Sequence, residues 1–206
     1  MNTHNKKSGS LEVICGPMFS GKSEELIRRL RRAIIARQTV LTFKPIIDDR
    51  YAKKKVQSHD GSTINALPVE NPKAILEQIH GHNSSVIGID EVQFFDNNVI
   101  GVICTLIDEG KRVIVSGLDL DFRCMPFGPM PMLLAIADKV IKLSAICTQC
   151  TAEAHFTQRL IDKKPASFND PIVLIGAQDS YEARCRNCHQ IDKKPCFKYE
   201  QKQTEL

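Results

Sequence analysis

Apolar residues follow two different spacings along the first 143 residues of the chain. Short apolar runs, typical of buried strands, alternate with segments in which apolar residues recur every three or four positions, as in an amphipathic helix. This alternation predicts an α/β fold with a mostly parallel sheet and helices on both faces. The expected strands are 11–15, 39–43, 63–67, 86–90, 112–116 and 139–143, and the expected helices are 23–37, 71–80, 97–110 and 131–137.

The pattern changes at residue 144, which divides the chain into two parts. Residues 11–143 are expected to form the α/β nucleotide-binding domain, and residues 144–191 a small metal-binding module. Residues 154–160 alternate like a strand, residues 163–170 are polar, and residues 176–181 are expected to form a turn. Residues 44–61 are polar and rich in turn formers, so they predict a long loop. Residues 1–10 are expected to be a disordered leader, and residues 192–206 a flexible tail.

A phosphate-binding motif connects the first strand to the first helix. The segment reads G-x-x-x-x-G-K-S, the P-loop pattern, in the strand–loop–helix context that the motif requires. Its glycines let the backbone wrap an anion, and the new helix offers free N–H groups and the positive end of its dipole. The lysine can reach the β- and γ-phosphates, and the serine hydroxyl can bind Mg²⁺. The candidate phosphate-binding residues are Gly16, Pro17, Met18, Phe19, Ser20, Gly21, Lys22 and Ser23.

The strand expected at 86–90 ends in two acids, Asp90 and Glu91. An apolar strand that delivers a carboxylate at its carboxyl end places it beside the P-loop, so Asp90 is a candidate Mg²⁺ partner. Glu91 either accepts a proton from an acceptor hydroxyl or activates water for ATP hydrolysis, and the residues alone favour neither role. Asp48, Arg50 and His59 in the long loop are further candidates to face the phosphates.

Two C-x-x-C pairs, Cys147 with Cys150 and Cys185 with Cys188, are separated by residues 151–184. Each pair forms a tight turn that directs two thiolates to one point, and together they predict a tetrahedral Zn²⁺ site. Four protein ligands leave no open position, so the expected role is structural. His189 is an alternative to Cys188 as the fourth ligand.

Composition narrows the function classes. The chain has 206 residues, 42% hydrophobic and 25% charged, with a net charge of +4. No apolar run reaches the roughly 18 residues that span a bilayer, and the first ten residues lack the apolar core of a secretion signal. We therefore expect a cytoplasmic protein without a membrane partner, in which the eight cysteines are not paired as disulfides. The absence of Trp and the modest charge argue against nucleic acid as a partner.

The motifs occur in an order that resembles one family. They are the P-loop, residues 90–95 (D-E-V-Q-F-F), residues 117–119 (G-L-D) with Phe122, residues 127–128 (F-G) and the two C-x-x-C pairs. Together they resemble the type II thymidine kinases, the cytosolic and bacterial type, over residues 11–188. The resemblance implies transfer of the γ-phosphate of ATP to the 5′-hydroxyl of thymidine for DNA precursor synthesis, which gives dTMP and ADP. It also implies Mg²⁺ with the ATP, inhibition by dTTP and a homotetramer.

The resemblance further implies a role for each matching residue. Glu91 would be the general base and Asp90 would serve Mg²⁺, while Gln93, Asp48 and Arg50 would join the P-loop around ATP. Backbone groups of a lasso loop, residues 160–178, would grip the base. Side chains around the nucleoside would be Phe122 stacked on thymine, Met18, Phe94 and Leu118 as walls, Thr157 near the 5-methyl group and Tyr181 near the sugar. The alternatives are a kinase for another deoxynucleoside and a zinc-ribbon ATPase that acts on nucleic acid.

Overall fold

The structure, a computed structural model, describes residues 8–47, 55–57, 61–172 and 180–193 of the chain. Its centre is a six-stranded sheet in the order β5-β2-β6-β7-β1-β8, in which every neighbouring pair is parallel. The predicted α/β class is therefore confirmed. The strands are β1 (Ser10–Cys15), β2 (Val40–Pro45), β5 (Leu67–Val69), β6 (Val86–Ile89), β7 (Arg112–Gly117) and β8 (Lys139–Lys142).

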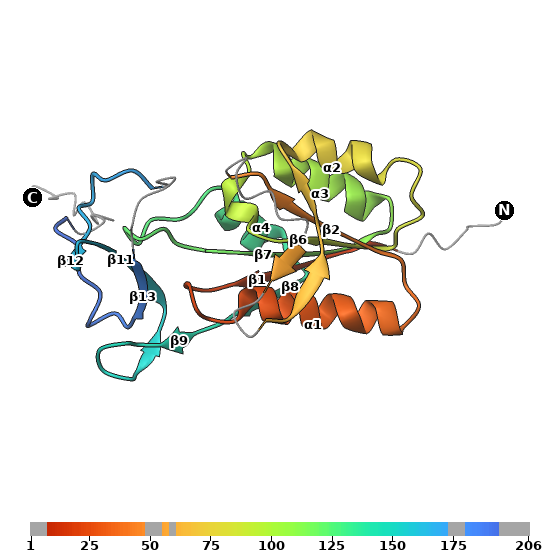
Figure 1. Ribbon diagram of the computed structural model, residues 1–206. Helices are drawn as coiled ribbons and strands as arrows, with labels where there is room; N and C mark the ends of the chain where they lie inside the picture. Colours follow the sequence, from red (N-terminus) through yellow and green to blue (C-terminus); the bar gives the residue numbers. More distant parts are fainter. Residues whose placement is uncertain (1–7, 48–54, 58–60, 173–179, 194–206) are drawn as a thin grey trace, which may run out of the picture.

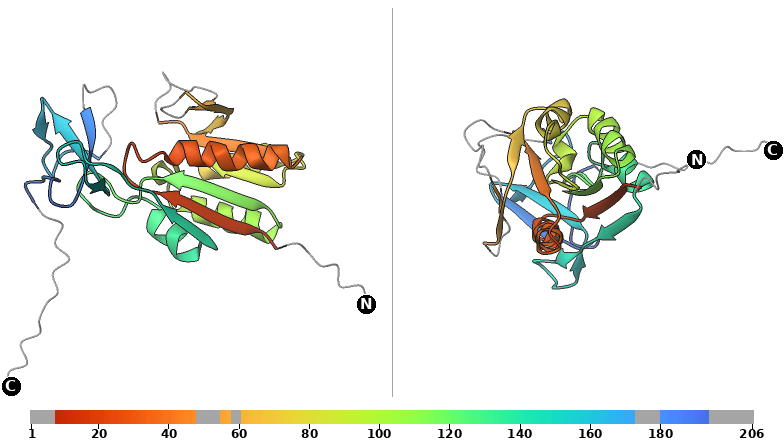
Figure 2. Two further views of the ribbon diagram at one scale, coloured as in Figure 1. Left: turned by 90° about the horizontal axis from the view of Figure 1, so that it is seen from below. Right: turned by 90° about the vertical axis from the view of Figure 1, so that its right-hand side faces the viewer.

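Helices cover both faces of this sheet (Figures 1 and 2). Helix α1 (Lys22–Ile35) packs on one face, where Leu26 and Leu30 join Ile14 in a small core. The other face carries α2 (Pro72–Ile79), α3 (Asn98–Asp108) and α4 (Met130–Ile136), whose apolar side chains form the larger core. Helix α2 begins where sequence rules expect it, because the Asn71 side chain accepts a hydrogen bond from the Ala74 N–H at 3.1 Å. No helix among the described residues has the length and apolarity to cross a bilayer.

The expected long loop contains a short hairpin, so that prediction was wrong in part. Strand β3 (Lys55–Gln57) pairs antiparallel with β4 (Thr63–Asn65), and the strand expected at 63–67 is divided between β4 and β5. Val56 anchors the hairpin, because it is 2% exposed and packs with Ile27 of α1 and with Ala66. A single apolar residue next to three lysines gives too short a pattern to reveal a strand.

The second part of the chain is a group of short antiparallel strands, which we call the cysteine module. Strand β9 (Ala145–Ile146) pairs with β10 (Glu153–Ala154), and β11 (Phe156–Ile161) pairs with β12 (Lys164–Pro165) and β13 (Ser180–Arg184). The expected turn at 176–181 is therefore wrong at its end, where β13 begins at Ser180. Of the β13 side chains that the structure describes, at residues 181–184, Ala183 and Arg184 are buried, so the strand lacks an apolar alternation.

The carboxyl ends of the parallel strands face the cysteine module (Figure 1). The P-loop follows β1 at this edge, and it contacts the module through the Met18 N–H, which donates to Thr157 Oγ1 at 3.0 Å. The small core of the module consists of the side chains Ala145, Cys147, Ala154, Ala183 and Cys185, with Cys188 packed against it. Such a core buries little apolar surface, so we expect a bound metal to supply much of its stability.

An ion network stabilises the opposite end of the sheet. Glu12 of β1 lies between Arg29 of α1 and Arg112 of β7, with Arg112 Nε 2.6 Å from Glu12 Oε1. The side chains of Glu12 and Arg29 are 12% and 6% exposed. Burial raises the pKa of Glu12, but the two guanidinium groups outweigh it and hold the pKa below its usual value. The charge of Glu12 therefore links three elements of the fold.

Glu12→Gln is expected to lower the free energy of unfolding by about 2 kcal/mol at pH 7, because it removes the carboxylate that pairs with Arg112 and leaves the buried Arg29 with Glu25 alone. A group with a lowered folded pKa contributes stability above its unfolded pKa, and the contribution disappears as pH falls through the folded pKa. The difference in the free energy of unfolding between wild type and variant should therefore become smaller from pH 7 to pH 3.5. Urea unfolding at a series of pH values measures it, with Glu77→Gln, an exposed site on α2, as the control. A gap that stays constant with pH would contradict this role.

Candidate active site and metal centre

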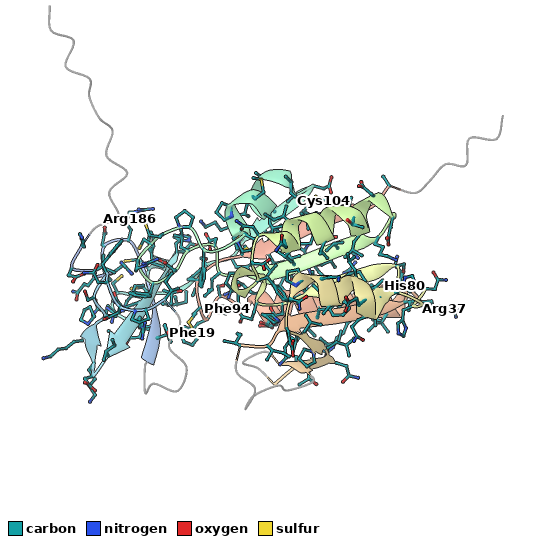
Figure 3. All side chains as sticks on the ribbon, turned by 90° about the horizontal axis from the view of Figure 1, so that it is seen from above. Phe19, Arg37, His80, Phe94, Cys104 and Arg186 are labelled. Carbon is teal, nitrogen blue, oxygen red and sulfur yellow. The ribbon has the colours of Figure 1, made fainter. Side chains whose placement is uncertain are left out.

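A cavity of about 670 Å³ lies at the carboxyl ends of the strands, against the cysteine module. Figure 3 shows Phe19 and Phe94 near this junction, and Arg37 and His80 at the far end of the sheet. Every side chain that we expected around the nucleoside lines this cavity. Its lining residues are Met18, Phe19, Gly21, Lys22, Ser23, Glu24, Ile47, Glu91, Phe94, Leu118, Asp121, Phe122, Phe127, Thr157, Ile172 and Tyr181.

The P-loop reaches the cavity in a conformation that its glycines permit. Gly21 directly precedes α1 with φ +81°, and a side chain at Gly16 would collide with the Leu143 carbonyl. Lys22 Nζ donates to the Pro17 carbonyl at 2.6 Å, and Ser20 Oγ donates to the same carbonyl at 2.8 Å. Lys22 is 9% exposed, and burial lowers its pKa. The P-loop carbonyl of Pro17 thus accepts a hydrogen bond from the lysine of the same loop. Gly16, Pro17 and Ser20 do not line the cavity, but they determine the conformation of the loop.

Asp90 lies directly after β6, between the P-loop and β7. Its Oδ2 accepts from Ser23 Oγ at 3.1 Å, and its Oδ1 accepts from Ser116 Oγ at 2.5 Å. Burial raises the pKa of Asp90, although the two hydroxyl donors act in the opposite direction. The sequence indicated Asp90 and Ser23, but it gave no signal for Ser116, since a serine at a strand end is common.

Glu91 is presented to the cavity by a strained turn. Its backbone is left-handed with φ +52°, and the short helix Val92–Phe94 follows. Gln93 Nε2 donates to Glu91 Oε2 at 2.5 Å, and Gln93 Oε1 accepts from the Leu118 N–H at 3.1 Å. Burial and the negative charge of Asp90 raise the pKa of Glu91. Gln93 is 2% exposed and lies outside the lining, so here it orients Glu91 and Leu118 from behind the cavity wall.

Aromatic side chains form a further wall of the cavity. Phe94 meets Phe127 edge to face, with ring centroids 5.5 Å apart. Phe122 lines the cavity and is 4% exposed. It is carried by a tight turn, in which Asp121 Oδ1 accepts from the N–H groups of Arg123 and Met125. A flat ring bound here would lie among aromatic faces, which favours a planar, partly apolar ligand.

Some expected residues are not placed, and some lining residues were not expected. Asp48, Arg50 and His59 lie outside the described residues. Of the expected lasso, residues 160–178, the structure describes residues 160–172, and the rest lies outside the described residues. Phe127, Asp121, Ile47 and Glu24 line the cavity without having been proposed for it, and so does the side chain of Ile172, from a lasso of which only backbone groups were expected at the base. Phe127 belongs to a motif that the sequence displayed, whereas the isoleucines resemble ordinary core residues.

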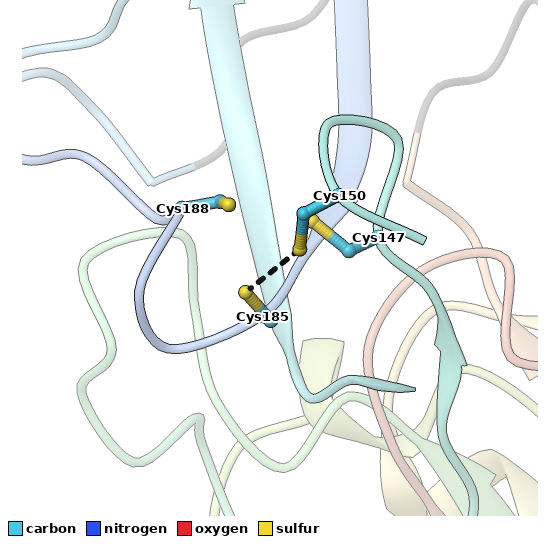
Figure 4. A group of neighbouring side chains, drawn as sticks. All are labelled: Cys147, Cys150, Cys185 and Cys188. Atoms are coloured by element: carbon cyan, nitrogen blue, oxygen red, sulfur yellow. Dashed lines mark hydrogen bonds between the residues drawn. The ribbon is translucent and has the colours of Figure 1, made fainter. Parts of the chain in front are cut away.

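The two C-x-x-C pairs meet in space (Figure 4). The four sulfur atoms of Cys147, Cys150, Cys185 and Cys188 lie within 4.8 Å of one another, and the Cys150 and Cys185 sulfurs are 3.5 Å apart. Four converging thiolates match the donor set and the size of a tetrahedral zinc site. His189 is not part of the cluster, because its Nε2 is 3.0 Å from the Phe122 carbonyl oxygen. The alternative with His189 as the fourth ligand is therefore not supported.

The geometry fits phosphoryl transfer better than simple nucleotide binding. A P-loop that ends at Lys22 and Ser23 is joined directly to Asp90, the pattern that holds a triphosphate with Mg²⁺. Glu91 lies in the same cavity as an aromatic wall, so a bound organic acceptor would be next to a carboxylate. The remaining wall, with Thr157 and Tyr181, comes from the cysteine module. A phosphate donor and an acceptor bound in this cavity would therefore meet between the two parts of the chain.

The comparison with protein families agrees with this geometry. A sequence model of the family described as thymidine kinase matches residues 9–189, which include the P-loop, both acids, the aromatic wall and all four clustered cysteines. The match ends directly after the second C-x-x-C pair and extends over most of the 206 residues. The chain belongs to the thymidine kinase family.

Proposed function

We propose that this kinase transfers the γ-phosphate of ATP to the 5′-hydroxyl of thymidine and releases dTMP and ADP. One observation carries the proposal: Glu91 and the ring of Phe122 line one cavity with Lys22 and Ser23 of the P-loop. A deoxynucleoside needs both features, because its base is planar and its 5′-hydroxyl must lose a proton. Thymine suits an aromatic cavity whose other wall contains few charged groups.

Glu91 would act as the general base. Its pKa is raised by burial and by Asp90, so its affinity for a proton exceeds that of an ordinary carboxylate. A base of this kind accepts the proton of the 5′-hydroxyl as the oxygen attacks phosphorus. Gln93 fixes one carboxylate oxygen of Glu91 through its amide. The other oxygen is then available to the acceptor.

Asp90, Ser23 and Lys22 would hold the donor. The Ser23 hydroxyl and the Asp90 carboxylate are hydrogen-bonded and are the oxygen ligands that Mg²⁺ prefers. When bound, Mg²⁺ neutralises charge on the phosphates. In the structure Lys22 Nζ donates a hydrogen bond to the Pro17 carbonyl of the same loop. When ATP binds, the ammonium group would exchange this carbonyl for a phosphate oxygen. Asp48 and Arg50 remain candidates for the same role.

Zinc at the four cysteines would have a structural role. Cys185 and Cys188 directly follow β13, which contains Tyr181, and β11 beside it contains Thr157. A metal that joins the two knuckles therefore fixes one wall of the acceptor cavity. We further propose that dTTP inhibits the enzyme by occupying this cavity, and that the active form is a cytoplasmic homotetramer, as the family resemblance implies.

A panel of nucleosides tests the proposed substrate. With Mg-ATP, thymidine should be phosphorylated faster than deoxycytidine or deoxyguanosine, because the cavity is largely apolar around the base. dTTP should inhibit competitively with thymidine, and gel filtration gives the oligomeric state. Faster turnover of another nucleoside would overturn the proposed substrate, and ATP hydrolysis stimulated by DNA or RNA with a steep salt dependence would overturn the reaction.

Glu91→Gln should lower kcat by about 10²- to 10⁴-fold, the usual contribution of general base catalysis. The affinity for ATP should change less than threefold, since the amide keeps the shape of the carboxyl group. In the wild type, kcat should also fall as pH is lowered through the raised pKa of Glu91, because only the carboxylate accepts a proton. Steady-state kinetics from pH 5 to pH 9 measures both effects. A variant that keeps wild-type kcat would show that another group is the base.

Cys150→Ser is expected to raise KM for thymidine about tenfold or more, because the loss of one metal ligand frees the acceptor wall. KM for ATP should stay within about twofold, as the P-loop is built on the parallel sheet. Cys104→Ser, at an exposed position of α3, is the matched control and should change neither constant. Zinc content by mass spectrometry accompanies the kinetics. An unchanged thymidine KM in a zinc-free variant would exclude this role of the metal.

A further inference from the structure

Arg159 is a buried charge to which the proposed reaction assigns no task. It lies in β11, its exposed fraction is 0%, and it is among the largest fully buried side chains. Taking a guanidinium group out of water is costly unless specific partners receive it. A buried arginine in a module whose small core is made of alanine and cysteine therefore calls for an explanation.

The guanidinium group contacts two parts of the acceptor wall. Its Cζ lies 5.3 Å from the centroid of the Phe122 ring, a cation–π contact. Its Nη1 donates to the Pro171 carbonyl at 2.5 Å, directly before Ile172. Phe122 and Ile172 line the cavity, whereas Arg159 does not. Arg159 thus packs behind the wall residues, on the side that faces away from the cavity.

The strand register places Arg159 beside two residues that line the cavity. Arg159 follows Thr157 by two positions, so both side chains lie on the same face of β11. Thr157 lines the cavity and accepts the P-loop hydrogen bond from the Met18 N–H. Across the strands, Arg159 is paired with Tyr181, which also lines the cavity. One buried side chain therefore lies next to several lining residues from separate segments.

We propose that Arg159 is a positioning residue for the nucleoside, which holds the Phe122 ring and the Pro171–Ile172 backbone in the geometry that receives the base. This inference rests on the proposed function, because it takes the acceptor to be a nucleoside. An arginine suits the task, since its flat guanidinium can stack on a ring and donate in its own plane at the same time. A lysine has neither the flat surface nor the fixed donor directions.

Arg159→Met tests the assignment by separating KM from kcat. KM for thymidine should rise about tenfold, in proportion to the loss of a desolvated cation–π contact and a hydrogen bond. The kcat value and KM for ATP should stay within about threefold, because Glu91 and the P-loop are not touched. Arg186→Met is the matched control: Arg186 makes the same kind of contact, at 4.8 Å, with Phe156, which is not a lining residue. It should leave KM for thymidine within about twofold.

A double-mutant cycle shows whether Arg159 acts through Phe122. In a Phe122→Leu background, Arg159→Met should raise KM for thymidine by less than about threefold, because the ring that it positions is already absent. The same rise in both backgrounds would overturn the proposal, since a purely structural role does not depend on Phe122. Equal effects of Arg159→Met and Arg186→Met on thymidine KM would overturn it too.

Thermal melting accompanies every variant, and Arg159→Lys serves as a second variant if Arg159→Met does not fold. The lysine should also raise KM for thymidine without lowering kcat, and an unchanged KM would overturn the proposal. The wild-type enzyme separates this inference from the proposed function. If wild type phosphorylates another nucleoside instead, the proposed substrate fails, and the same cycle is measured with that nucleoside. If wild type uses thymidine but Arg159→Met binds it normally, only the positioning role fails.

Discussion

The structure depends on two neighbouring carboxylates, the buried Asp90 and the partly buried Glu91, which lines the cavity. Asp90 and Glu91 repel each other, and burial raises the pKa of both. The fold tolerates them because Ser23 and Ser116 donate to the first, Gln93 donates to the second, and the lysine of the P-loop lies nearby. These partners come from three different parts of the sheet edge. The parallel strand order that brings them together is therefore a requirement of the chemistry as well as of the core.

The strand and helix order of the first 143 residues could be predicted because burial leaves a regular trace in the sequence. Strands such as β6 and β7 are buried on both faces, so they read as continuous apolar runs. The short strands β3 and β13 left no such trace. Val56 and Ala183 are their buried apolar anchors, and the rest of each strand is polar. Backbone pairing, of β3 with β4 and of β13 with β11, defines these strands more than side-chain burial does.

The site also contains residues that the sequence marked and residues that it did not. Lys22, Ser23, Asp90 and the four clustered cysteines were recognisable because their chemistry demands fixed residue types at fixed spacings. Ser116 and Arg159 contact Asp90 and Phe122, neighbours that only the folded chain supplies, so no spacing marks them. Gln93 illustrates the difference: its motif placed it at the site, but the side chain faces Glu91 and Leu118 and not the cavity.

The hydrogen bond from the Met18 N–H to Thr157 Oγ1 has a thermodynamic consequence. It joins the P-loop to β11, the strand that supplies Thr157 to the cavity. In the proposed reaction, a displacement of the P-loop upon ATP binding would change the free energy of nucleoside binding. Linkage makes such an effect reciprocal, so the nucleoside would alter the affinity for ATP by the same factor. The two proposed substrates would thus be energetically coupled through one main-chain N–H group and one threonine hydroxyl.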